Sequence, residues 1–187
     1  MIKFIITFIL LFTVSYIAPC IAPFFSLSQI NTQSTYLQEN TKDTTQRVEG
    51  IAVHVKDGDT LVFREKNGYK YNVRLYGIDT PEKSQPYGPQ ATGILKELVS
   101  NKNLVLRVYG EDRYKRKLAK VYVDGRDINA TLLAKGAAWH YKKYDKSSDY
   151  SSYASLEAKA KHEKKGLWNK DKPIPPWTYR QSKKEKQ

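Results

Sequence analysis

The hydrophobic pattern of the chain changes once near its start. After Lys3, residues 4–25 form an uncharged and mostly apolar run. A positive start followed by such a run is typical of a signal peptide, although the run is also long enough to span a bilayer. We therefore expect residues 1–28 to be a signal peptide or an N-terminal membrane anchor. The polar residues 29–46 are expected to form a linker or pro-segment.

From Val48 onward, short runs with β-propensity follow one another. Apolar and polar residues alternate within them, which is typical of strands with one buried face. The strands predicted in this way are 49–56, 59–66, 69–77, 103–109 and 117–123. Asn67-Gly68, between the second and third strands, is a strong signal for a two-residue hairpin turn.

Helical signals appear in three places. Pro89 opens a predicted helix over 89–100, and helices over 127–135 and 149–165 end at Gly136 and Gly166. The proline-rich stretch 173–177 is expected not to be helical.

Five strands with a helix after the third is the order of a small Greek-key barrel. We therefore predict an α+β domain over residues 47–170, a five-stranded OB-type Greek-key β-barrel with about three helices. A basic C-terminal tail over residues 171–187 would follow it.

The charge of the chain points to an anionic partner. The 187 residues carry 32 Lys and Arg against 19 Asp and Glu, a net charge of +13. Such a field attracts polyanions, so nucleic acid and a merely solubilising surface both account for it. The single cysteine, Cys20, excludes an intrachain disulfide and a cysteine-based zinc site. No protein partner is evident, and a monomer is expected.

The hairpin geometry brings two carboxylates together. With a two-residue turn, Leu61 would lie opposite Arg74 and Asp59 opposite Tyr76. Asp79 follows shortly after the third strand. We therefore expect Asp59 and Asp79 to meet at one end of the hairpin.

Glu82 adds a third carboxylate in the same loop, after Pro81. Like charges so close repel unless a cation joins them, and oxygen ligands favour Ca²⁺ or Mg²⁺. Alternatively, Asp57 and Asp79 only shape turns while Asp59 forms a surface ion pair with Arg74. That alternative does not account for Glu82.

A second basic cluster, DRYKRK, occupies residues 112–117. Arg113 and Arg116 are suited to bidentate contacts with phosphate oxygens, and Tyr114 to stacking on a base. A solvated charged loop is the alternative for this cluster taken alone.

Four segments together resemble the staphylococcal nuclease, or thermonuclease, family. They are DGDT (57–60), RLYGIDTPE (74–82), DRYKRKLA (112–119) and VDGRDIN (123–129). Their order and separations match as well, over roughly residues 48–170. The resemblance implies an OB barrel with three helices and Ca²⁺-dependent hydrolysis of phosphodiesters in DNA and RNA.

The resemblance also implies roles for individual residues. Asp59, Asp79 and the backbone carbonyl of Thr80 would bind Ca²⁺ rather than Mg²⁺. Glu82 would act as general base or orient the attacking water. Arg74 and Arg116 would hold the scissile phosphate.

Tyrosines would line the nucleotide site. Tyr114 is one of them, and Tyr141 and Tyr144 are candidates for a second contact. Lys115 departs from the family, which often has glycine there. A nuclease-like domain that only binds nucleic acid remains an alternative, although it predicts missing catalytic residues and none is missing. The N-terminal segment implies a protein that is secreted, or anchored on the outer side of the cytoplasmic membrane.

Overall fold

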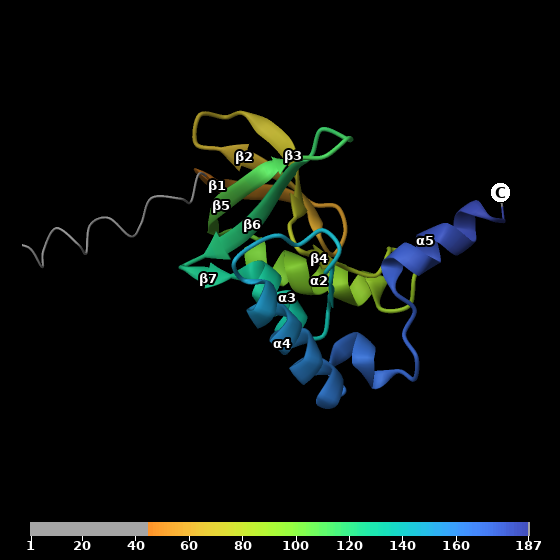
Figure 1. The fold of residues 1–187 in the computed structure, drawn as a ribbon. Coiled ribbons are helices and arrows are strands. Elements are labelled where there is room, and N and C mark those ends of the chain that lie inside the picture. The colour runs from red at the N-terminus through yellow and green to blue at the C-terminus, as the bar shows by residue number, and fades with distance from the viewer. Residues whose placement is uncertain (1–44, 187) are drawn as a thin grey trace, which may run out of the picture. The chain divides into compact units, whose positions relative to one another are not determined.

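Five strands curl into a closed barrel in the computed structural model, which describes residues 45–186 (Figure 1). They are β1 (Gln46–Val55), β2 (Thr60–Glu65), β3 (Lys70–Leu75), β5 (Asn103–Glu111) and β6 (Lys117–Val123). They run in the order β3-β2-β1-β5-β6, and a parallel pairing of β3 with β6 closes the sheet. This confirms the predicted OB-type α+β fold. Residues 1–28 and most of the predicted linker lie outside the described residues.

The β2–β3 hairpin has a different register from the one predicted. Thr60 pairs with Arg74, and Leu61 pairs with Val73 rather than with Arg74. The loop holds three residues, because the amide of Gly68 donates to the carbonyl of Glu65 at 3.0 Å and the Glu65 amide donates to Tyr69 at 2.9 Å. Gly68 has φ +91°, as three-residue hairpins with a left-handed third residue require. The prediction of a two-residue turn, and of Asp59 opposite Tyr76, was therefore wrong.

Four α-helices accompany the barrel among the described residues. They are α2 (Gly88–Val99), α3 (Ile128–Ala134), α4 (Tyr150–His162) and α5 (Pro176–Lys184), with a short 3-10 helix, η2 (Gly166–Asn169), after α4. The sequence predicted the first three but not α5. Pro176 and Trp177 are helical, contrary to the prediction for 173–177, because a proline in the first turn needs no amide donor.

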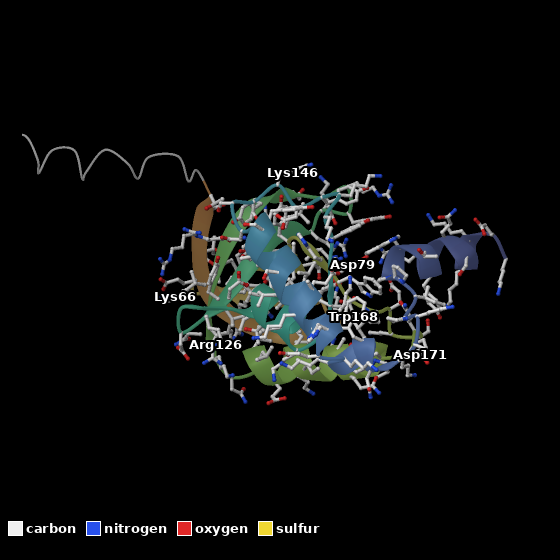
Figure 2. All side chains as sticks on the ribbon, turned by 60° about the horizontal axis from the view of Figure 1, so that its bottom comes forward. Lys66, Asp79, Arg126, Lys146, Trp168 and Asp171 are labelled. Atoms are coloured by element: carbon white, nitrogen blue, oxygen red, sulfur yellow. The ribbon has the colours of Figure 1, made fainter. Side chains whose placement is uncertain are left out.

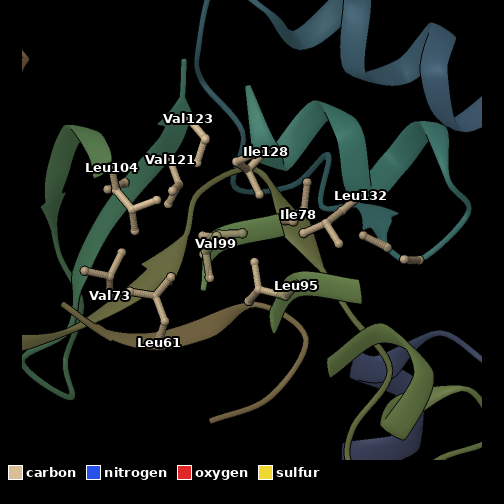
Figure 3. Packing of buried hydrophobic residues seen from close by; sticks show 14 of the residues in the cluster. Leu61, Val73, Ile78, Leu95, Val99, Leu104, Val121, Val123, Ile128 and Leu132 are labelled. Carbon is tan, nitrogen blue, oxygen red and sulfur yellow. The ribbon is translucent and has the colours of Figure 1, made fainter. Parts of the chain in front are cut away.

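The core fills the space between the barrel and two of these helices (Figure 3). Leu61 and Val73 point inward from the hairpin, and Leu95 from α2 and Leu132 from α3 belong to the same buried cluster. All four side chains are fully buried. Burial of each such side chain contributes about 1.5–3 kcal/mol, so this core holds the loops at the barrel end in place.

Three two-residue strands extend the framework. They are β4 (Ile78–Asp79), β7 (Arg126–Asp127) and β8 (Trp139–His140). β4 pairs with β8, which fixes the segment that carries Asp79. Within residues 45–186, no helix has the length and apolar character needed to cross a membrane.

Candidate active site

A cleft of about 940 Å³ opens at one end of the barrel. It brings together every residue that the sequence assigned to a site: Asp59, Arg74, Asp79, Thr80, Glu82, Tyr114, Arg116, Tyr141 and Tyr144. Its size is in the range of sites for small molecules and nucleotides. The side chains of α5 also line it, so the cleft includes part of the predicted tail.

Asp59 is held by the bend between β1 and β2. Its backbone amide donates to Oδ1 of Asp57 at 3.1 Å. Its own Oδ2 accepts from the amide and the hydroxyl of Thr80, at 2.7 and 2.8 Å. Asp59 and Thr80 are both buried. The two segments that supply predicted cation ligands are therefore joined directly.

Arg74 bridges the two aspartates. Its Nη1 lies 3.0 Å from Oδ2 of Asp59, and its Nη2 donates to Oδ1 of Asp79 at 2.7 Å. The expected convergence of Asp59 and Asp79 is thus present, although the register used to predict it was not. The alternative of a surface ion pair does not fit, because the Arg74 and Asp59 side chains are only 12% and 8% exposed.

Burial sets the protonation behaviour of two acids at this end. It raises the pKa of Asp79 above its ordinary value, against the lowering effect of Arg74. Burial, followed by the charge of Asp59, raises the pKa of Asp57 to about 6. In both acids, burial disfavours the charged form of the carboxyl group.

Arg180, on α5, was not predicted as a site residue. Its Nη2 lies 2.8 Å from Oδ2 of Asp79, and its Nη1 donates to Oε1 of Glu82 at 2.7 Å. Burial lowers the pKa of Arg180, but the hydrogen bonds to Asp79 and Glu82 outweigh it and raise the pKa overall. The guanidinium is therefore permanently charged. Figure 2 labels Asp79 on the side of the molecule from which α5 extends. In the sequence, the only signal for this contact was the basic character of residues 171–187.

Arg116 lies on the β5–β6 hairpin, across the cleft. Its Nε donates to Oδ2 of Asp112 at 2.8 Å, and Asp112 Oδ1 accepts from the amides of Tyr114 and Arg116. Asp112 therefore shapes the loop, a role that was not predicted, although an aspartate that accepts from a backbone amide two residues later is a common turn signal. Lys115 has φ +61°, the left-handed conformation that glycine adopts without strain. Lys115, where the family often has glycine, therefore adopts the left-handed backbone conformation that glycine favours.

Tyrosines line the side of the cleft toward α5. The Tyr141 and Tyr144 rings lie 4.6 Å apart, and the Trp177 ring is stacked on Tyr141 at 5.4 Å with an interplanar angle of 5°. Tyr114 is exposed on the opposite hairpin, with the Arg116 guanidinium 5.5 Å from its ring centre. Trp177, like Arg180, was not predicted to line a site.

The donor chemistry suits a hard cation. Asp59 and Asp79 offer carboxylate oxygens, the ligand type that Ca²⁺ and Mg²⁺ prefer. Within residues 45–186, however, no three His, Cys, Asp or Glu side chains are arranged to hold a metal ion together. Guanidinium groups from Arg74 and Arg180 occupy the carboxylate oxygens instead.

Comparison with known proteins supports the same interpretation. A family model described as staphylococcal nuclease homologue matches residues 72–170. An uncharacterized endonuclease of Escherichia coli O157:H7 is 36% identical over 137 residues, covering 73% of this chain and 87% of that protein. One from Haemophilus influenzae is 39% identical over 132 residues, covering 71% and 72%. A probable staphylococcal-like nuclease of Oryza sativa subsp. japonica is 41% identical over 115 residues, covering 62% of this chain. The chain spans only 34% of that plant protein.

Proposed function

Because the chain belongs to the family of staphylococcal nuclease homologues, we propose that it is a nuclease that hydrolyses phosphodiester bonds in DNA and RNA with little sequence preference. One observation carries the proposal: three carboxylates and two guanidinium groups of the predicted set line a single open cleft. A phosphodiester needs both kinds of group. Cations stabilise the charge that grows on its oxygens, and a carboxylate handles the proton of water.

Ca²⁺ is the cation that we propose for this cleft. Asp59, Asp79 and the backbone carbonyl of Thr80 would hold it. Ca²⁺ accepts irregular sets of six to eight oxygen ligands, whereas Mg²⁺ demands near-octahedral geometry. When bound, the cation supplies Lewis-acid stabilisation of charge on the phosphate oxygens.

The two arginines would bind the scissile phosphate. Arg74 is held by Asp59 and Asp79, and Arg116 by Asp112, so both side chains have little conformational freedom to lose when their remaining N–H groups bind phosphate. Tyr114, Tyr141 and Tyr144 would contact the nucleotide on either side of the phosphate. Because aromatic stacking is tolerant of sequence, this arrangement supports a substrate without a required base.

Glu82 would accept a proton from the attacking water, or orient that water. It follows Pro81, and its amide donates to Oε1 of Gln85 at 3.1 Å, which fixes the backbone that carries it. The side chain is 39% exposed, so water reaches it from the cleft. We also propose that the protein acts outside the cytoplasm as a monomer, secreted or held at the membrane by its N-terminal segment.

The test is cleavage of single-stranded DNA by the purified full chain in Ca²⁺, in Mg²⁺ and in chelator. Cleavage that requires Ca²⁺ would support the proposal. Binding without cleavage in all three conditions would contradict it and favour a nucleic-acid-binding module.

Replacement of the acid tests its role. Glu82→Gln keeps the shape of the side chain and removes the proton acceptor, so kcat should fall by about 10²–10⁴ while DNA binding persists. Glu97→Gln, an exposed acid on α2, is the matched control and should cleave normally. Unchanged turnover in Glu82→Gln would remove Glu82 from the mechanism.

A further inference from the structure

Helix α5 places two side chains into the cleft from one face. Trp177 and Arg180 are three residues apart, so they project in nearly the same direction from the helix. Trp177 reaches Tyr141, and Arg180 reaches Asp79 and Glu82. These are the proposed base-stacking residue, a proposed cation ligand and the proposed general base.

Arg180 occupies the oxygens on which the proposed chemistry depends. Its guanidinium forms hydrogen bonds of 2.8 Å with Asp79 and 2.7 Å with Glu82. A divalent cation on Asp79 and a water molecule on Glu82 would use the same carboxylate oxygens. Charge-assisted hydrogen bonds from arginine are strong and directional, so the cation must compete with Arg180 for them.

Trp177 covers the stacking surface in the same way. Its ring lies almost parallel to Tyr141, with an interplanar angle of 5°. This is the arrangement that a nucleobase adopts on an aromatic platform. Trp177 therefore lies where a base would stack on Tyr141. Arg180 lies where the cation and the attacking water would contact Asp79 and Glu82.

The attachment of α5 suits a segment that can leave. Pro176 is its only buried residue, and the core draws no member from α5. Trp177 also packs edge-on against Trp139, with the ring centres 5.7 Å apart. Two further links are exposed hydrogen bonds: the Tyr179 hydroxyl donates to the Ser84 carbonyl at 3.0 Å, and Lys183 Nζ donates to Ser84 Oγ at 2.9 Å. Exposed polar contacts contribute little stability, so the contacts of Trp177 and Arg180 are the main ones that hold α5 in the cleft. Ligands that replace these two contacts would therefore release α5 while the barrel stays folded. Figure 1 shows α5 outside the barrel, beyond the end of α2.

We propose that α5 is an autoinhibitory segment, which occupies the cleft through Trp177 and Arg180 and is displaced by divalent cation and single-stranded nucleic acid. This inference rests on the proposed function, because it takes the cation and the nucleotide as the competitors. In the closed form, α5 occupies the cleft. The apparent Kd for either ligand then equals the Kd of the open form divided by the fraction of molecules that are open.

Calorimetric titration of the full chain with Ca²⁺, without nucleic acid, tests the role of Arg180. Arg180→Gln should bind Ca²⁺ about tenfold more tightly than the unmodified chain, a change of about 1.4 kcal/mol. Lys186→Gln removes the same charge from an exposed position beyond α5, so it controls for net charge and should leave the affinity unchanged. Equal or weaker Ca²⁺ binding by Arg180→Gln would overturn the inference.

An independent titration in chelator tests Trp177. Trp177→Ala should bind a fluorescent single-stranded DNA oligonucleotide about threefold more tightly, because Tyr141 becomes available. Tyr69→Ala, which removes an exposed aromatic from the β2–β3 hairpin, should leave binding unchanged. Weaker binding by Trp177→Ala would overturn autoinhibition and make Trp177 part of the substrate platform. Thermal unfolding of each variant confirms that it is folded.

These outcomes separate the inference from the proposed function. If the unmodified chain and Arg180→Gln bind Ca²⁺ equally and cleave equally, the nuclease proposal stands and autoinhibition fails. If neither binds Ca²⁺ and neither cleaves, the proposed function fails, and the inference fails with it.

Discussion

Arg74→Met should destabilise the protein strongly in the absence of a divalent cation. The side chain is 12% exposed and bridges Asp59 and Asp79, which are 8% and 1% exposed. Removing one partner of a buried ion pair costs about 3–5 kcal/mol, because the other charge is left unpaired. Asp59 retains two hydrogen bonds from Thr80, and Asp79 retains Arg180, so we expect the lower end, about 3 kcal/mol. Methionine has nearly the same length, which limits any cavity.

The assay is urea denaturation at pH 7.5 in chelator, followed by the same measurement in Ca²⁺. Arg126→Met is the control, since Arg126 is exposed and lies on the far side of the molecule from Asp79 and α5 in Figure 2. It should change the free energy of unfolding by less than about 0.5 kcal/mol. Ca²⁺ should restore part of the loss in Arg74→Met, because it supplies positive charge to the same carboxylates. An effect as small as that of the control would refute the reasoning that the guanidinium compensates buried charge.

Three further predictions concern the same end of the barrel. Asp57→Asn should leave stability unchanged near pH 4 and raise it by about 1 kcal/mol at pH 8 in chelator, after a discount for partial exposure. The sign follows because folding raises the pKa of Asp57 from 3.8 to about 6, so the unmodified protein loses stability as the pH rises through that interval. A difference in the free energy of unfolding between variant and unmodified protein that does not change with pH in urea denaturation would contradict it. Gly58→Ala should reduce cleavage and Ca²⁺ binding together, because the added Cβ would lie 2.6 Å from Thr80 Oγ1 and displace the bend that carries Asp59. Normal activity in that variant would show that the bend adjusts. Affinity for single-stranded DNA should fall about tenfold between about 50 mM and about 200 mM salt, as expected for two or three phosphate contacts, and anisotropy titrations that show no salt dependence would exclude an electrostatic interface.

Local signals predicted most of the barrel because its strands have distinct boundaries. β6 begins and ends at the predicted residues, and α2 differs by one residue at each end. The register of the β2–β3 hairpin was missed because it depends on whether Lys66 belongs to the strand or the loop. The observed register pairs Leu61 with Val73 and Phe63 with Tyr71, so apolar side chains share the buried face, whereas the predicted register set Leu61 opposite Arg74. The left-handed Gly68 in a three-residue loop agrees with the observed register.

The same limit explains what was missed at the site. Asp59, Arg74 and Asp79 lie near one another in sequence, so a hairpin and a short loop suffice to bring them together. Arg180 reaches Asp79 only through the path of the chain after α4, and nothing in the local pattern of residues 171–187 sets that path. α5 contributes a single aromatic ring, Trp177, to its packing and buries only Pro176, which is too little to form a periodic apolar face in the sequence.

The parallel pairing of β3 with β6 determines at which stage of folding the cleft is assembled. Arg74 pairs with Leu118, which follows Arg116 by two residues, so closure of the barrel also brings the two guanidinium groups to the same rim. Contacts between segments so distant in sequence form late, because a long loop must be closed first. A nascent or unfolded chain therefore carries every group of the cleft without assembling it. Under the proposed export, a chain that crosses the membrane before it folds would complete the cleft only outside the cytoplasm.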